Sequence, residues 1–140
     1  MSQTNATAAR PRILIVDDEE SMRLLLAKIL AIGLKAEVSL AGTCEQALHQ
    51  ATSHAYDAIL LDLLMPGIGG VEVLKEVRRA SLNTATPVII VSVLADRETH
   101  DRCMAAGATA YHVKPVQRNA LVATVKSQIA GRGKPKTKDN

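Results

Sequence analysis

Short runs of aliphatic residues that end abruptly in polar residues constrain the fold of this chain more than any other feature. The first run is Ile-Leu-Ile-Val at residues 13–16, and Asp17, Asp18, Glu19 and Glu20 follow it directly. A run without polar alternation is typical of a strand buried on both faces, as in a parallel sheet. The acids also suit the start of a helix, because carboxylates stabilise a helix N-terminus. A helix start needs only one capping residue, so it does not account for the Asp17–Asp18 pair.

The rest of the chain alternates predicted strands and helices five times. Such alternation indicates an α/β fold in which a parallel sheet is covered by helices on both faces. Thr43 is expected to cap the second helix, and Gly33, Gly107 and Gly131 are expected to end three helices. The strands are predicted at about 12–16, 35–40, 58–61, 88–92 and 110–113, and the helices at about 19–32, 44–53, 71–80, 97–106 and 116–130.

Composition and charge place the chain among soluble single-domain proteins. Hydrophobic residues make up 47% of its 140 residues, yet no apolar run approaches the roughly 20 residues of a membrane span. Residues 1–10 lack the apolar segment of a secretory signal, so we expect a cytoplasmic protein with free cysteines. The net charge of +3 comes from the end of the chain, where four basic residues face one acid. We therefore predict a disordered N-terminus at 1–10, a folded domain at 11–131 and a basic disordered tail at 132–140.

Polar residues stand at the ends of four of the five predicted strands. Asp17 and Asp18 follow the first strand, Asp62 follows the third, Ser92 ends the fourth and Lys114 follows the fifth. The carboxyl ends of parallel strands meet at one edge of the sheet, where α/β proteins bind ligands. Three carboxylates there would repel by roughly 3 kcal/mol per pair, so the group must hold protons or a cation. The set predicts phosphoryl transfer to an Asp, with Mg²⁺ neutralising the charge.

At these residues the chain resembles the receiver domains of bacterial two-component response regulators. The spacing also resembles that family, with 44 residues from Asp18 to Asp62, 30 to Ser92 and 22 more to Lys114. The resemblance implies a flavodoxin-like (βα)5 receiver fold, a doubly wound sheet of five parallel strands in the order 2-1-3-4-5. The segments that carry it are VDDEE at 16–20, LLDLLMPGIGG at 60–70, VIIVS at 88–92 and AYHVKP at 110–115.

The resemblance implies that Asp62 is the phosphoacceptor. Mg²⁺ would be bound by Asp17, Asp18, Asp62 and the backbone carbonyl of Leu64. Lys114 would contact the phosphoryl group. No other cofactor is implied.

The resemblance also implies a conformational switch. The Ser92 hydroxyl would be drawn toward the phosphoryl oxygens, and Tyr111 would rotate inward into the space that Ser92 leaves. Pro115 would follow a cis peptide bond, which only an X-Pro bond adopts at low cost. The surface presented to partners would be formed by the segments 97–106, 110–113 and 116–130.

The implied function is that of a single-domain response regulator, phosphorylated by a sensor histidine kinase or a small phosphodonor and signalling to a protein partner. It would be no enzyme beyond its own phosphorylation and dephosphorylation. We expect no DNA-binding domain, because nothing after residue 131 resembles a helix-turn-helix, and no membrane contact. A weak or phosphorylation-dependent dimer is compatible with the family. Two alternatives stay open: a relay intermediate that passes the phosphoryl group to a histidine phosphotransfer protein, and a receiver cut from a longer regulator.

Other classes fit the same residues less well. A haloacid-dehalogenase-like phosphatase needs a second acid two residues after its nucleophile, and Leu64 stands there. A flavodoxin-like cofactor binder would need a phosphate-binding loop rich in Ser, Thr and Gly after the first strand, where this chain is acidic. The chain departs from the receiver pattern at Val93, Leu64 and Leu94, where the family has small or polar residues. We expect this apolar rim to exclude water and to prolong the life of the aspartyl phosphate.

Overall fold

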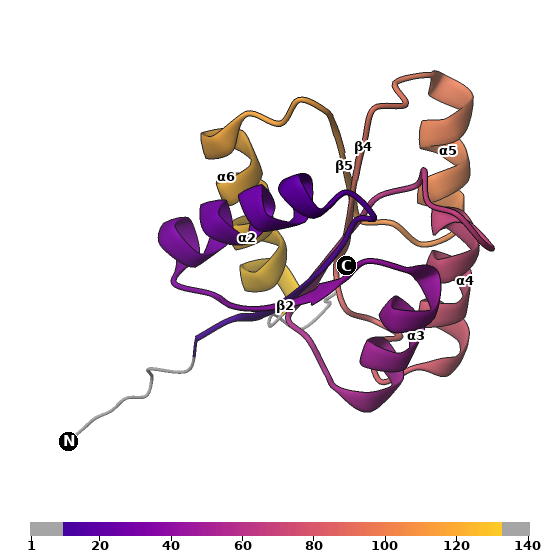
Figure 1. Cartoon of the computed structure of the whole chain (residues 1–140), viewed down its shortest axis with the longest axis horizontal. Coiled ribbons are helices and arrows are strands. Elements are labelled where there is room, and N and C mark those ends of the chain that lie inside the picture. The colour runs from indigo at the N-terminus through magenta and orange to yellow at the C-terminus, as the bar shows by residue number, and fades with distance from the viewer. Residues whose placement is uncertain (1–9, 133–140) are drawn as a thin grey trace, which may run out of the picture.

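The computed structural model describes residues 10–132, which form five strands and five helices (Figure 1). Residues 1–9 and 133–140, on which most of the two predicted disordered ends falls, lie outside the described residues. The strands are β1 (Arg12–Val16), β2 (Glu37–Ala41), β3 (Ala58–Leu61), β4 (Val88–Ser92) and β5 (Ala110–Val113). The helices are α2 (Glu20–Leu34), α3 (Cys44–Ser53), α4 (Gly70–Ala80), α5 (Arg97–Ala105) and α6 (Arg118–Arg132).

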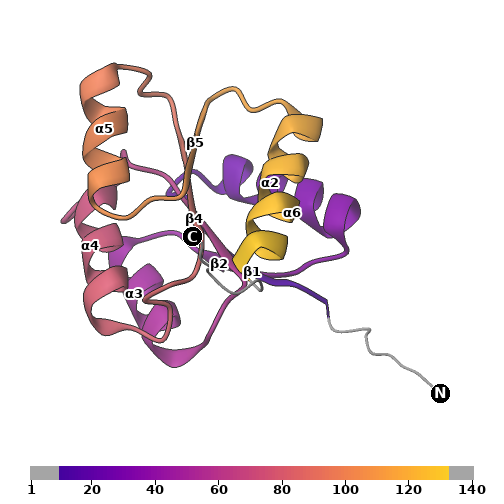
Figure 2. The same ribbon diagram turned by 180° about the vertical axis from the view of Figure 1, so that it is seen from behind.

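The five strands form one parallel sheet in the order β2-β1-β3-β4-β5, which confirms the predicted topology. Helices α2 and α6 cover one face of the sheet, and α3, α4 and α5 cover the other (Figures 1 and 2). After β2 the chain crosses β1 to build the other half of the sheet. The strand order therefore reverses between β1 and β3, and a crevice is expected at their carboxyl ends.

Two aliphatic cores explain why the strands read as continuous apolar runs. Ile13 and Ile15 of β1 point into the core under α2 and α6, whereas Leu14 and Val16 point into the core under the other three helices. All four side chains are at most 2% exposed. Alternate residues of a strand face opposite sides, so a strand covered on both sides has no polar position.

The first helix ends later than predicted, because Gly33 serves packing rather than helix termination. Helix α2 continues through Gly33 to Leu34, and Lys35 takes the left-handed conformation with φ 53°. A Cβ atom on Gly33 would lie 2.7 Å from Cγ2 of Val122 on α6. The glycine thus lets α2 and α6 approach closely, and β2 begins at Glu37 instead of residue 35.

The last helix is shifted toward the C-terminus, and a local hydrogen bond marks its start. Gln117 Oε1 accepts a hydrogen bond from Ala120 N (2.6 Å), so α6 begins at Arg118 rather than at residue 116. Gly131 does not end it: the helix continues to Arg132, one residue into the predicted tail. The other two predicted markers are confirmed, since the Thr43 side chain accepts from Gln46 N and Gly107 has φ 112° after α5. None of the helices within residues 10–132 has the length and hydrophobicity needed to cross a bilayer.

Candidate functional site

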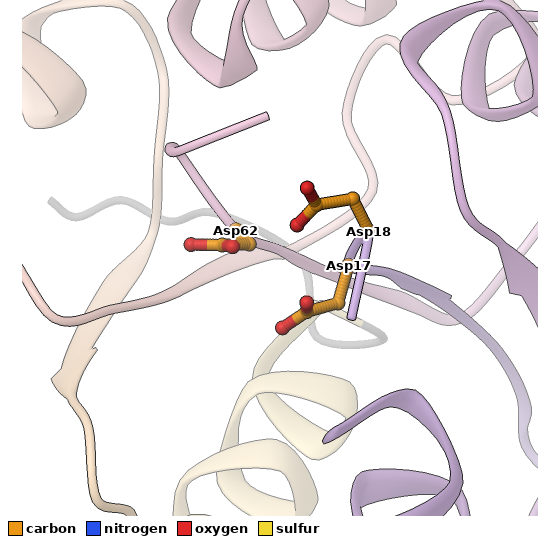
Figure 3. Close-up of side chains that lie close together, drawn as sticks. All are labelled: Asp17, Asp18 and Asp62. Atoms are coloured by element: carbon orange, nitrogen blue, oxygen red, sulfur yellow. The ribbon is translucent and has the colours of Figure 1, made fainter. Parts of the chain in front are cut away.

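Three carboxylates meet at the carboxyl edge of the sheet, where β1 and β3 end side by side (Figure 3). One oxygen each of Asp17, Asp18 and Asp62 lies within 4.8 Å of the others. Asp62 continues the pairing of the two strands, because its N–H donates to Val16 O (2.9 Å). Asp17 and Asp62 are buried, with 1% and 5% of their surface exposed, whereas Asp18 is exposed. The topology thus brings the adjacent acids Asp17 and Asp18 together with Asp62, which follows Asp18 by 44 residues along the chain.

Lys114 supplies the positive charge of this site. Its Nζ lies 2.7 Å from Asp17 Oδ2 and 3.6 Å from Asp62 Oδ2, and its side chain is 10% exposed. The Lys114 N–H donates to Ser92 O (2.8 Å), and the Lys114–Pro115 peptide bond is cis, as predicted. Burial acts to lower the pKa of Lys114, but the hydrogen bond to Asp17 and the charge of Asp62 outweigh it and raise the pKa. The ammonium is therefore held charged between two buried carboxylates.

The site carries more negative charge than Lys114 neutralises. Burial raises the pKa of Asp62; the charge of Lys114 opposes this shift and the charge of Asp17 adds to it. Converging carboxylate oxygens are the hard ligands that Mg²⁺ prefers, and a divalent cation would remove the excess charge. The donor set therefore fits Mg²⁺ bound by Asp17, Asp18 and Asp62. The Leu64 N–H donates to Asp62 Oδ1 (3.4 Å), and the metal-binding role of its carbonyl stays a prediction.

Ser92 and Tyr111 are linked through the backbone of Leu94. Ser92 is fully buried, and its Oγ accepts a hydrogen bond from Leu94 N (3.2 Å). The Tyr111 hydroxyl donates to Leu94 O (2.7 Å), and its ring packs on His100 with centroids 5.4 Å apart. Burial raises the pKa of Tyr111. The half-buried tyrosine thus already bonds to the segment after β4, and its rotation on phosphorylation stays a prediction.

Apolar side chains stand at the positions predicted to form a rim beside Asp62. Leu64 is 51% exposed and Val93 is 57% exposed, whereas Leu94 is half-buried. Leu64 lies on the segment after β3 and Val93 lies on the segment after β4, and these two strands are neighbours in the sheet. The structure therefore leaves two unburied apolar side chains on the segments that carry the site.

Arg23 also contacts the acidic site, and this role was not predicted from the sequence. It lies in the first turn of α2, and its Nη1 donates to the backbone carbonyl of Asp17 (2.7 Å). The only signal in the sequence is an arginine six residues after Asp17, which is common on any helix surface. Its link to the site depends on the geometry of the turn between β1 and α2.

Similar proteins carry a sequence of this kind as one part of a longer chain. Transcriptional regulatory protein ResD of Bacillus subtilis is 35% identical over 129 residues, which cover 92% of this chain and 50% of that protein. Sensory/regulatory protein RpfC of Xanthomonas campestris pv. campestris is 35% identical over 116 residues, 81% of this chain and 16% of that protein. This chain thus spans half or less of these curated relatives.

Solved structures of similar chains have the same fold. A CheY-like response regulator receiver domain protein from Methanospirillum hungatei JF-1 has a TM-score of 0.83 and 28% identity, covering 89% of this chain and 98% of that chain. The receiver domain of sensor histidine kinase PA1611 from Pseudomonas aeruginosa PAO1, with magnesium coordinated in its active-site cleft, has a TM-score of 0.78 and 28% identity over 87% and 99%. The profile of the response regulator receiver domain family matches residues 13–126. With most of its length matched and its fold shared, this chain belongs to the response regulator receiver domain family.

Proposed function

We propose that this chain is a cytoplasmic signalling domain controlled by phosphorylation of Asp62. The phosphoryl group comes from a phosphohistidine of a sensor histidine kinase or from a small phosphodonor. The observation that carries the proposal is the position of Asp62, which is 5% exposed, clustered with two further acids and 3.6 Å from the Lys114 ammonium. Once a cation balances the negative charge of the three carboxylates, Asp62 can act as a nucleophile toward a negatively charged phosphoryl group.

The transfer is a single displacement at phosphorus. An oxygen of Asp62 forms a bond to phosphorus while the P–N bond of the phosphohistidine breaks. The electron pair leaves with the imidazole nitrogen, which takes up a proton from solvent. A bound Mg²⁺ would supply charge neutralisation at the phosphoryl oxygens. Lys114 then donates to one phosphoryl oxygen, and the buried Ser92 hydroxyl donates to another.

The phosphoryl group changes the output surface by shifting a conformational equilibrium. It carries nearly two negative charges in place of the single charge of the Asp62 carboxylate, together with three acceptor oxygens, and it favours whichever conformation pairs them better. Ser92 lies at the start of a hydrogen-bonded path through Leu94 to Tyr111 of β5. We infer that α5, β5 and α6 form the surface that a protein partner reads. In this proposal the chain catalyses only its own phosphorylation and dephosphorylation.

Intact-mass measurement after incubation with Mg²⁺ and phosphoramidate tests this proposal. The wild-type chain is expected to gain one phosphoryl group, and Asp62→Asn none. Asp101→Asn is the matched control, since it removes an exposed carboxylate on α5, and it should be phosphorylated like wild type. A wild-type chain that gains no mass from phosphoramidate, acetyl phosphate or a panel of phosphorylated sensor kinases would refute the proposal. Loss of the label to an added histidine phosphotransfer protein would identify a relay intermediate.

A further inference from the structure

Asp18 owes its place in the acidic cluster to its backbone rather than to its side chain. The Asp18 side chain is exposed, and it makes no hydrogen bond or ion pair within residues 10–132. One of its oxygens nevertheless lies within 4.8 Å of the buried carboxylates of Asp17 and Asp62 (Figure 3). The turn between β1 and α2 must therefore hold Asp18 in this position.

Three hydrogen bonds close that turn around Asp18. Asp17 Oδ1 accepts from Glu19 N (2.9 Å), and Glu19 O accepts from Arg23 N (3.0 Å) in the first turn of α2. The third bond runs from Arg23 Nη1 to Asp17 O (2.7 Å). Arg23 is thus bonded to the residue before Asp18 and to the residue after it. It makes no ion pair among the described residues, so it acts on the turn through backbone atoms.

Gly42 provides the space in which the Arg23 guanidinium lies. A Cβ atom on Gly42 would be 2.7 Å from Arg23 Nη1 and 3.2 Å from Cζ, so a methyl group and the guanidinium cannot share this position. The displaced atoms would be the far end of a flexible side chain, so the backbone can stay in place. Gly42→Ala is therefore a way to move the guanidinium without removing its charge.

We propose that Arg23, held against Gly42, is a positioning residue of the Mg²⁺ site that fixes Asp18 through the carbonyl of Asp17. This inference rests on the proposed function, because it takes Mg²⁺ as the ligand of the three carboxylates. The expected sign distinguishes positioning from simple electrostatics. A nearby positive charge repels Mg²⁺, so loss of the Arg23 charge alone would tighten binding. Loss of positioning weakens it, as with other groups that orient metal ligands.

Isothermal titration of the metal-free chain with Mg²⁺ tests the inference with three variants. We expect Arg23→Met and Gly42→Ala to raise the dissociation constant for Mg²⁺ on the order of tenfold. Arg23→Lys, which keeps a donor and a charge, should recover most of the wild-type affinity. Arg97→Met is the matched control, because it removes an exposed arginine on α5 and should leave the affinity unchanged.

Amide chemical shifts of the metal-free protein separate positioning from a general structural defect. In Gly42→Ala, apart from residues near the substitution, the amides of Asp18 and Glu19 are expected to shift while those of β3 and β4 stay in place. Affinity equal to or tighter than wild type in both Arg23→Met and Gly42→Ala would overturn the positioning role. A wild-type chain that binds no Mg²⁺ would overturn the proposed function together with this inference, so the two failures are distinguishable.

Discussion

Replacing Asp62 with asparagine is expected to stabilise the metal-free protein. Oxygens of Asp17 and Asp18 lie within 4.8 Å of Asp62, so each repels it by at least roughly 3.5 kcal/mol at an effective dielectric of 20. The Lys114 ammonium at 3.6 Å attracts it by roughly 4.5 kcal/mol on the same scale. The two repulsions exceed the attraction by about 2 kcal/mol. Because Asp18 is exposed, solvent weakens its share, and we expect a gain of about 1–2 kcal/mol.

Urea unfolding in EDTA at pH 7, followed by circular dichroism because the chain has no Trp, measures this gain. With an m-value of about 2 kcal/mol per molar urea, the midpoint of Asp62→Asn should rise by about 0.5–1 M. Asparagine keeps the shape of the side chain and can still accept from Leu64 N. The exposed control Asp101→Asn should change the free energy of unfolding by no more than about 0.5 kcal/mol.

Mg²⁺ should reduce or reverse the difference between the two proteins. A ligand at 100 times its dissociation constant stabilises the native state by about 2.7 kcal/mol. The wild-type chain should gain this stabilisation, whereas Asp62→Asn, with one carboxylate ligand fewer, should gain less. An Asp62→Asn variant that is less stable than wild type in EDTA would show that the attraction of Lys114 dominates, which would refute the reasoning. A difference that does not change with Mg²⁺ would refute its metal-binding part.

Three further predictions concern the rim, the pH dependence and the far edge of the sheet. Leu64→Asn should speed hydrolysis of the phosphorylated chain by roughly 10- to 100-fold, because an amide can hold the attacking water; an unchanged decay of phosphorylated mass would contradict the role of the rim. The raised pKa of Asp62 means that its protonated form favours the folded state. The stability that protonation of Asp62 contributes is complete below the unfolded pKa of about 3.9 and is lost as pH rises through the raised pKa of the folded protein. Without metal, the urea midpoint of the wild-type chain should therefore fall between these two pH values more than that of Asp62→Asn. Asn83→Ala should cost about 3 kcal/mol or more, because its buried amide accepts from Tyr56 N (2.7 Å) and donates to Ala51 O (2.8 Å). The urea midpoint of Asn83→Ala should drop, while phosphorylation of the folded variant stays normal. A midpoint equal to that of wild type would show that water replaces the hydrogen bonds of the Asn83 amide.

The strand ends were predictable because they depend on signals that are local in the sequence. A buried run such as 58–61 has no polar position, so the first polar residue after it, Asp62, marks where the strand leaves the core. Parallel pairing then brings all such residues to one edge of the sheet. The approximate location of Asp17, Asp62 and Lys114 follows from these two facts alone.

The contacts that hold the site in place were not predictable in this way. Gly33 reads as a helix end until Val122, 89 residues later, is seen to lie against it. Arg23 likewise reads as a surface arginine until the space above Gly42 is known. Both depend on distances between elements that are far apart in the chain, and hydrophobic periodicity contains no such distances.

Leu94 divides two functions between its side chain and its backbone. The side chain is one of the apolar groups on the segment after β4, where we expect it to limit access of water. The N–H donates to Ser92 Oγ, and the C=O accepts from the Tyr111 hydroxyl. A movement of Ser92 toward a phosphoryl group would either break its bond to Leu94 N or carry residue 94 with it, and in the second case the acceptor of the Tyr111 hydroxyl moves as well. Because Leu94 contributes only backbone atoms to this link, we expect substitutions at position 94 to change the lifetime of the phosphorylated state while the proposed path from Ser92 to Tyr111 is kept.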